Sequence, residues 1–312
     1  MRSAMRNAMR DAMWSSLLAA LVLTIVAPPR AIGAQGGTDV WVAPLSEIGS
    51  RLSVGRPVNV TNRAGYDNQP AFTRDGSQVL FTSVRDDAQA DIWRVSVTGG
   101  AHTRVTTTTE SEYSATPIPG GEGISVIRVE RDSTQRLWRF ADDGGSPSLV
   151  LHALRPVGYH VWIGPATLGT FVLGGPLNMA NSPPNALVLV DARTERADTL
   201  ARGIGRALAR VPGRDAFTFV QEEADTNWIS EVDVRTGAVR RLVAAPPRAD
   251  YHVWTVGGQL ITAVGSRLLV RVEGRWDVLA DFAPLGVKGI SRLALSPAGD
   301  RIAFVAADVN SP

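Results

Sequence analysis

Short apolar runs separated by turn residues recur along this chain. The clearest set lies between Tyr66 and Thr106, where four such runs follow one another and Asp75-Gly76 occupies the first turn. Runs rich in β-branched and aromatic residues and bounded by Gly, Pro, Asp and Asn predict strands joined by tight turns. Four strands in this order predict one antiparallel meander. From Gln35 onward we find no amphipathic helical pattern.

The meander recurs with a period of about 46 residues. All four tyrosines of the protein fall at the same phase, with separations of 47, 46 and 92 residues: Tyr66, Tyr113, Tyr159 and Tyr251. The first strands of successive units begin near Gln69, Ser114, His160, Arg206, His252 and Ser291. Periods of this length indicate a repeat architecture. The predicted fold is therefore all-β, with six four-stranded antiparallel units.

The sixth unit stops after its second strand, at Ala307-Asp308, and its missing half lies at the other end of the chain. Thr38–Val42 matches the third strand of the first unit, and Arg56–Thr61 matches the fourth. A sheet shared by both ends removes the free edges that an open row of strands exposes. We therefore predict a closed six-bladed β-propeller whose last blade is completed by N- and C-terminal strands.

The repeat also carries a family resemblance. Pro70–Ser83, followed by Asp91–Val95, resembles the repeat of the TolB-like six-bladed β-propeller family, and Ser296–Phe304 resembles another copy. The resemblance covers nearly the whole chain after Gln35, with eroded copies in the middle. It implies an exported or periplasmic propeller, which most often presents a surface for binding other proteins.

Residues 1–34 have the pattern of a secretory signal peptide. Three arginines within the first ten residues precede an apolar run from Trp14 to Ala27, and small residues follow at 31–34. The apolar run of about 14 residues is shorter than the roughly 20 needed to span a bilayer. We expect cleavage near Gln35, a single propeller domain over residues 35–312, a periplasmic or secreted location, and no membrane span after cleavage.

Removing the leader changes the charge argument. The leader holds four arginines and one aspartate, so the remaining chain has 28 basic and 29 acidic residues. The sequence pI of about 9.4 therefore does not indicate nucleic-acid binding, because no basic surplus remains. With no cysteine, the chain has neither disulfides nor thiolate metal sites.

One constellation of polar residues stands out from the repeats. Tyr159-His160-Val161-Trp162 recurs two units later as Tyr251-His252-Val253-Trp254. The first strand of each propeller blade lines the central channel, so residues near its start converge at one mouth. Counting from the tyrosine phase, the equivalent positions are Asp67, Ser114, His160, Arg206, His252 and Ile290. We expect a ligand site at the channel mouth formed by Asp67, Tyr159, His160, Arg206, Tyr251 and His252.

Three functions remain open, and one of them, a small-ligand sensor, differs from the two others only in what fills the channel. We prefer a non-catalytic, cofactor-free module that binds a protein partner in the cell envelope, with room for a small ligand in the channel. The alternative is a metal-dependent lyase or hydrolase of pectin fragments, which the resemblance allows because some TolB-like propellers use a channel histidine cluster. Two histidines and an aspartate could bind a metal, but two histidines without a local third ligand make a weak site. The two copies could equally be remnants of repeat duplication that face channel water.

Overall fold

The computed structural model describes residues 37–85, 87–175 and 182–308, and the predicted leader with its cleavage site lies outside these ranges. Within them the chain is built almost entirely of β-strands, and Ala283–Leu285 forms a single 3-10 turn. No helix in this part of the chain is long and apolar enough to cross a membrane. The all-β prediction is confirmed.

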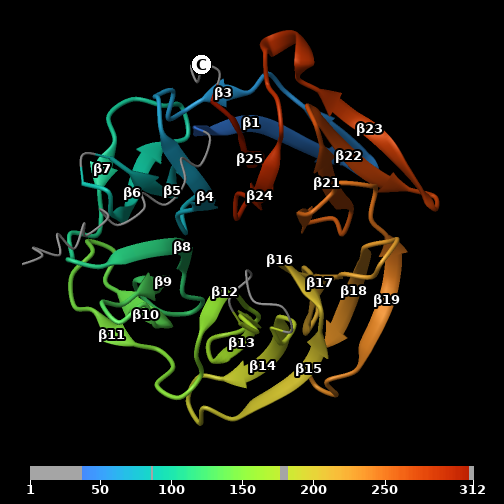
Figure 1. Ribbon diagram of the computed structural model, residues 1–312. Helices are drawn as coiled ribbons and strands as arrows, with labels where there is room; N and C mark the ends of the chain where they lie inside the picture. The colour runs from blue at the N-terminus through green and yellow to red at the C-terminus, as the bar shows by residue number, and fades with distance from the viewer. Residues whose placement is uncertain (1–36, 86, 176–181, 309–312) are drawn as a thin grey trace, which may run out of the picture. The chain divides into compact units, whose positions relative to one another are not determined.

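Five blades follow one another along the chain, each an antiparallel meander (Figure 1). Blade 1 contains β4 (Tyr66–Phe72), β5 (Gln78–Val84), β6 (Ala90–Ser96) and β7 (Thr103–Arg104). Blade 2 contains β8 (Ser111–Pro117), β9 (Ile124–Val129), β10 (Gln135–Phe140) and β11 (Ser148–Leu149). Blade 3 contains β12 (Val157–Trp162), β13 (Thr167–Val172), β14 (Ala186–Asp191) and β15 (Ala197–Arg202). Blade 4 contains β16 (Ile204–Arg210), β17 (Ala216–Gln221), β18 (Trp228–Asp233) and β19 (Val239–Ala244). Blade 5 contains β20 (His252–Trp254), β21 (Leu260–Val264), β22 (Arg267–Val272) and β23 (Arg275–Asp281).

Blade 6 is assembled from both ends of the described chain, as predicted. Its C-terminal strands are β24 (Ser291–Leu295) and β25 (Arg301–Ala307), and its N-terminal strands are β1 (Thr38–Ile48) and β3 (Val58–Asn59). The antiparallel pairing of β1 with β25 runs over seven residue pairs, from Thr38↔Ala307 to Pro44↔Arg301. In Figure 1 the blue β1 lies beside the red β25. This pairing closes the propeller.

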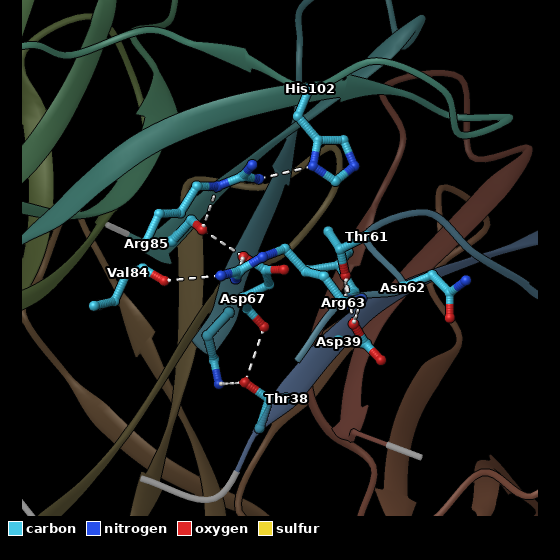
Figure 2. A network of polar contacts seen from close by, with 12 residues as sticks. Thr38, Asp39, Thr61, Asn62, Arg63, Asp67, Val84, Arg85 and His102 are labelled. Carbon is cyan, nitrogen blue, oxygen red and sulfur yellow. Dashed lines mark hydrogen bonds and ion pairs between the residues drawn. The ribbon is translucent and has the colours of Figure 1, made fainter. Parts of the chain in front are cut away.

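A buried carboxylate holds β1 to its outer neighbour. Asp39 is fully buried, and its Oδ1 accepts hydrogen bonds from Thr61 Oγ1 at 3.0 Å and from the Arg63 backbone N–H at 3.2 Å (Figure 2). Its Oδ2 accepts a hydrogen bond from Asn59 Nδ2 at 2.9 Å. Thr38 Oγ1 donates to the Asp67 carbonyl at 3.0 Å, which ties β1 to the first strand of blade 1. Side chains therefore reinforce the backbone closure.

The strand β1 is longer than the sequence pattern predicted. It continues past Val42 to Ile48 and turns into β2 (Arg51–Val54), forming a hairpin. Near the tip of this hairpin, Glu47 accepts three hydrogen bonds of 2.9–3.0 Å from the turn formed by residues 255–259 of blade 5. The closing strand thus braces a second blade as well as completing its own.

Apolar residues fill the spaces between neighbouring blades. One cluster joins Leu80 and Ile92 of blade 1 to Val126 of blade 2, and another joins Leu187 of blade 3 to Phe217 of blade 4. Inward-facing residues that alternate along each strand supply both sides of these clusters. The core is thus divided among the blade interfaces.

We predict that the closing strands are essential for folding. Deleting residues 35–61 removes β1, β2 and β3, leaves β25 with an unpaired buried edge and should cause aggregation or unfolding. The control is a chain that lacks only residues 1–34. Both chains are compared by size-exclusion chromatography and thermal melting. A deletion variant that stays monomeric with an unchanged Tm would contradict the closure.

Candidate functional site

A cavity of about 140 Å³ lies among the first strands of the six blades. Each blade contributes at least one polar residue to its lining, among them Gln69, Ser114, His160, Arg206, His252 and Arg292. The volume is close to that of the roughly 150 Å³ engineered cavities that hold one benzene molecule. The cavity can therefore take a ligand of about six non-hydrogen atoms or one end of a longer molecule.

Five of the six site residues expected from the sequence line this cavity. They are Tyr159, His160, Arg206, Tyr251 and His252. Asp67 does not line it. Its side chain is fully buried, and its Oδ1 accepts hydrogen bonds from Ser83 Oγ at 2.5 Å and from Arg63 Nη1 at 3.2 Å (Figure 2). Burial raises the pKa of the Asp67 carboxyl group, and these two bonds oppose that change. Asp67 therefore links β4 and β5 to the preceding loop.

The tyrosines do not share one structural position, and the count from them therefore misplaced two residues. The bulge in β4 follows Asn68, two residues after Tyr66, whereas the bulge in β8 follows Tyr113 directly. Gln69, Ser114 and Arg292 each lie at a register shift in the first strand of their blade, with φ angles of 55°, 55° and 48°. Positive φ is uncommon outside glycine, and bulges redirect side chains. Each of the three residues lines the cavity. As a result, Gln69 occupies the place expected for Asp67, and Arg292 the place expected for Ile290.

Arg292 is the charged group at the centre of the site. Its Nη2 donates a hydrogen bond of 2.9 Å to Tyr159 Oη. Its guanidinium carbon lies 4.8 Å from the ring centroid of Tyr159 and 4.5 Å from that of Tyr251. Burial alone would lower the pKa of Arg292, but the surrounding tyrosines hold it above the ordinary value. Within the described residues no carboxylate pairs with this cation.

The first Tyr-His-Val-Trp copy forms a contact between blades. His160 Nε2 lies 2.7 Å from Ser125 Oγ, which belongs to β9 of the preceding blade. Trp162 Nε1 donates to the same hydroxyl at 2.8 Å. We call this arrangement of one histidine and one tryptophan on one hydroxyl a staple.

The second copy repeats the staple between blades 4 and 5. His252 Nε2 lies 2.7 Å from Thr218 Oγ1 of β17, and Trp254 Nε1 donates to the same oxygen at 2.9 Å. The sequence repeat therefore corresponds to a repeated structural contact. Each histidine also lines the cavity, and the Nδ1 atom of each is buried without a hydrogen-bond partner.

Both staple histidines are neutral at physiological pH. Burial lowers the pKa of His160 to about 3 and that of His252 to about 4. A group with so low a pKa is almost entirely deprotonated near neutral pH, so neither imidazole is suited to act as a general acid at that pH.

The lining does not fit a divalent metal. Across residues 37–85, 87–175 and 182–308, no group of three or more His, Cys, Asp or Glu residues is close enough to hold a metal ion. The charged residues of the lining, Arg206 and Arg292, are both cations. A positive lining without carboxylates repels a metal ion and attracts an anion.

Comparison with known proteins identifies the fold. No protein-family model matches the chain. Among solved structures, the TolB-type protein of Agrobacterium tumefaciens superposes with a TM-score of 0.65, at 14% identity over 87% of this chain and 98% of that one. The chain folds as a TolB-like β-propeller. A gluconolactonase of Xanthomonas campestris gives a TM-score of 0.59, at 12% identity over 85% of this chain and 94% of that one. An oligogalacturonate lyase of Vibrio parahaemolyticus gives 0.50, at 11% identity over 77% and 88%. At these identities the likeness extends to the fold alone.

Sequence reasoning missed Gln69 and Arg292 as lining residues of this TolB-like propeller. A second pattern would have found them. In four blades the polar lining residue is followed directly by three residues of the first strand that are small or apolar, apart from the polar Thr116. These lining residues are Gln69, Ser114, Arg206 and Arg292. This polar-then-apolar step marks the bulge position in β4, β8 and β24 independently of the tyrosines.

We predict that Ser125→Ala destabilises the propeller by about 1–3 kcal/mol, because it leaves a buried imidazole nitrogen and a buried indole N–H without a partner. Ser148→Ala, on the exposed outer strand of the same blade, should change stability by less than about 0.5 kcal/mol. Urea unfolding of both variants provides the comparison. Equal effects of the two substitutions would show that the staple does not contribute.

The two histidines should also make stability depend on pH. Below the unfolded pKa of 6.5, the unfolded chain binds protons at both positions while the folded chain does not. The free energy of unfolding should therefore be nearly constant above about pH 7.5 and fall as the pH decreases from there to 5. A variant with His160→Gln and His252→Gln should show a smaller decrease over this interval. Parallel curves from urea titrations at pH 8, 6.5 and 5 would contradict the assignment.

Proposed function

We propose that this chain is an exported, non-catalytic binding module of the cell envelope whose partner is a protein. The main support for the proposal is that both channel histidines form staple contacts with the preceding blade. The Nε2 atoms of the two imidazoles already bond to Ser125 and Thr218, and the Nδ1 atom of each ring is buried. The remaining charged groups of the lining are guanidinium groups, which bind and orient but do not exchange protons near neutral pH.

Two lines of reasoning support a protein partner and an envelope location. The first is the TolB-like fold together with the leader pattern of residues 1–34. The second is a pair of exposed apolar side chains where blades 5 and 6 meet. Ile48 is 78% exposed at the tip of the β1–β2 hairpin, and Val256 is 60% exposed in the turn that Glu47 contacts. Exposed apolar side chains on adjoining turns favour contact with another protein.

The alternative is a metal-dependent lyase that acts on pectin fragments. The fold-level likeness to an oligogalacturonate lyase favours it. The donor set of the cavity opposes it, because the described residues bring no third metal ligand to the two histidines. The binding module is therefore the function that the geometry supports better.

A two-part experiment tests the proposal. Purified protein incubated with oligogalacturonate, with and without manganese, should form no unsaturated uronate product. An envelope protein captured from the native host is then identified, purified and titrated against the propeller. Saturable binding is expected for the wild type and should be lost in the double variant Ile48→Asp, Val256→Asp.

Val239→Asp provides the matched control, because Val239 is an exposed valine on the outer strand of blade 4. This variant should bind the partner as the wild type does. Turnover of the oligosaccharide would reject the non-catalytic assignment, and equal binding by all three proteins would reject the surface.

A further inference from the structure

The cavity lining carries positive charge that nothing in the described chain balances. Arg206 and Arg292 line it, and no aspartate or glutamate does. The nearest acidic groups lie outside the lining. Asp67 is engaged with Ser83 and Arg63, and Asp250, next to Tyr251, is exposed to solvent. A largely buried cation without a counter-charge is costly, so this cavity favours an anion.

Arg292 has hydrogen-bonding capacity to spare. A guanidinium group carries five N–H donors in a planar fork. Among the described residues, Tyr159 Oη is its one hydrogen-bond acceptor, and the rings of Tyr159 and Tyr251 contact it through their π systems. Cation–π contacts offset part of the desolvation of the charge but leave the other N–H donors without a protein acceptor among the described residues. A carboxylate matches two parallel donors of this fork.

The backbone of β24 holds Arg292 in place for such a contact. Its φ of 48° is unusual for a residue with a side chain, and it coincides with a bulge between Ser291 and Leu293. Residues in sparsely populated backbone regions gather at ligand sites, where the surrounding structure maintains them. Gln69 and Ser114 share this conformation and also line the cavity.

Size and wall chemistry narrow the class of anion. About 140 Å³ accommodates a molecule of about six non-hydrogen atoms. The apolar side chains of Leu208 and Leu293, together with the tyrosine rings, form walls suited to a short carbon skeleton. We propose that the channel cavity binds a small organic acid, whose carboxylate pairs with the guanidinium of Arg292 while Arg206 lies at the exposed side of the cavity. The inference rests on the proposed function only in treating this cavity as a place of binding without turnover.

Isothermal titration calorimetry at low ionic strength tests the proposal with matched probes. Acetate and succinate should bind saturably to the purified protein, whereas acetamide and succinamide should not. Arg292→Gln should weaken succinate binding at least about tenfold, since hydrogen bonds to charged groups contribute on this scale. Arg292→Lys keeps the charge but loses the fork, so its affinity should fall between the two.

Two further variants serve as internal comparisons. Arg206→Gln should weaken binding less than Arg292→Gln, because Arg206 is exposed. Arg210→Gln, at the exposed end of the same strand and outside the cavity lining, should leave binding unchanged. Circular dichroism establishes that each variant is folded. If Arg292→Gln does not fold, Arg292→Lys and Arg206→Gln still decide the outcome.

Four results would overturn the inference. They are no saturable binding of the acids, equal binding of the amides and the acids, equal or tighter binding of phosphate, and undiminished succinate binding by both folded Arg292 variants. The outcome is separable from that of the proposed function. Turnover of oligogalacturonate rejects the function while carboxylate binding can still be measured, and absence of carboxylate binding without turnover rejects this inference alone.

Discussion

The pairing of β1 with β25 is the contact on which the rest of the structure depends. Seven residue pairs join strands from opposite ends of the described chain, and they remove the edges that blade 6 would otherwise expose. Closure also has a consequence for the cavity. It positions β24 so that Arg292 meets Tyr159, a residue 133 positions earlier in the chain. The contact between Arg292 and Tyr159 therefore forms only in the closed propeller.

In the closed propeller, polar residues on the inner strands have two different roles. His160 and His252 bond to hydroxyl groups of the preceding blade, which fixes neighbouring sheets, and burial lowers their pKa so that both rings are neutral. Arg292 has aromatic contacts and one hydrogen bond but no counter-charge within the described residues. The first kind of residue is committed to stability, and the second remains available for a ligand. This division favours binding over catalysis at the channel mouth.

The fold could be predicted from the sequence because its evidence is local. The spacing of the tyrosines indicates the repeat, and the resemblance of Thr38–Val42 to a third strand indicates that the N-terminal segment completes the last blade. The candidate site was harder to predict. Tyr66 lies two residues before the position that Tyr113 occupies in its own strand, so counting from the tyrosines placed Asp67 where Gln69 lies. The sixth unit lacks a tyrosine, so its phase was set at Ile290 and Arg292 was missed.

The histidines illustrate a different limit of sequence reasoning. Their repetition was visible, but their partners, Ser125 and Thr218, lie more than 30 residues earlier, on another blade. Pairing of this kind follows from how the blades pack, which no single repeat encodes. The sequence identified both histidines as residues that approach the channel, and the packing of the blades determines which groups they bond to.

A crystal structure of the protein with saturating succinate tests the central claim most directly. The account predicts a carboxylate against the guanidinium of Arg292, beside the rings of Tyr159 and Tyr251, with both staples intact. A cavity that excludes succinate, or one in which His160 and His252 leave Ser125 and Thr218 to ligate a metal ion, would contradict it.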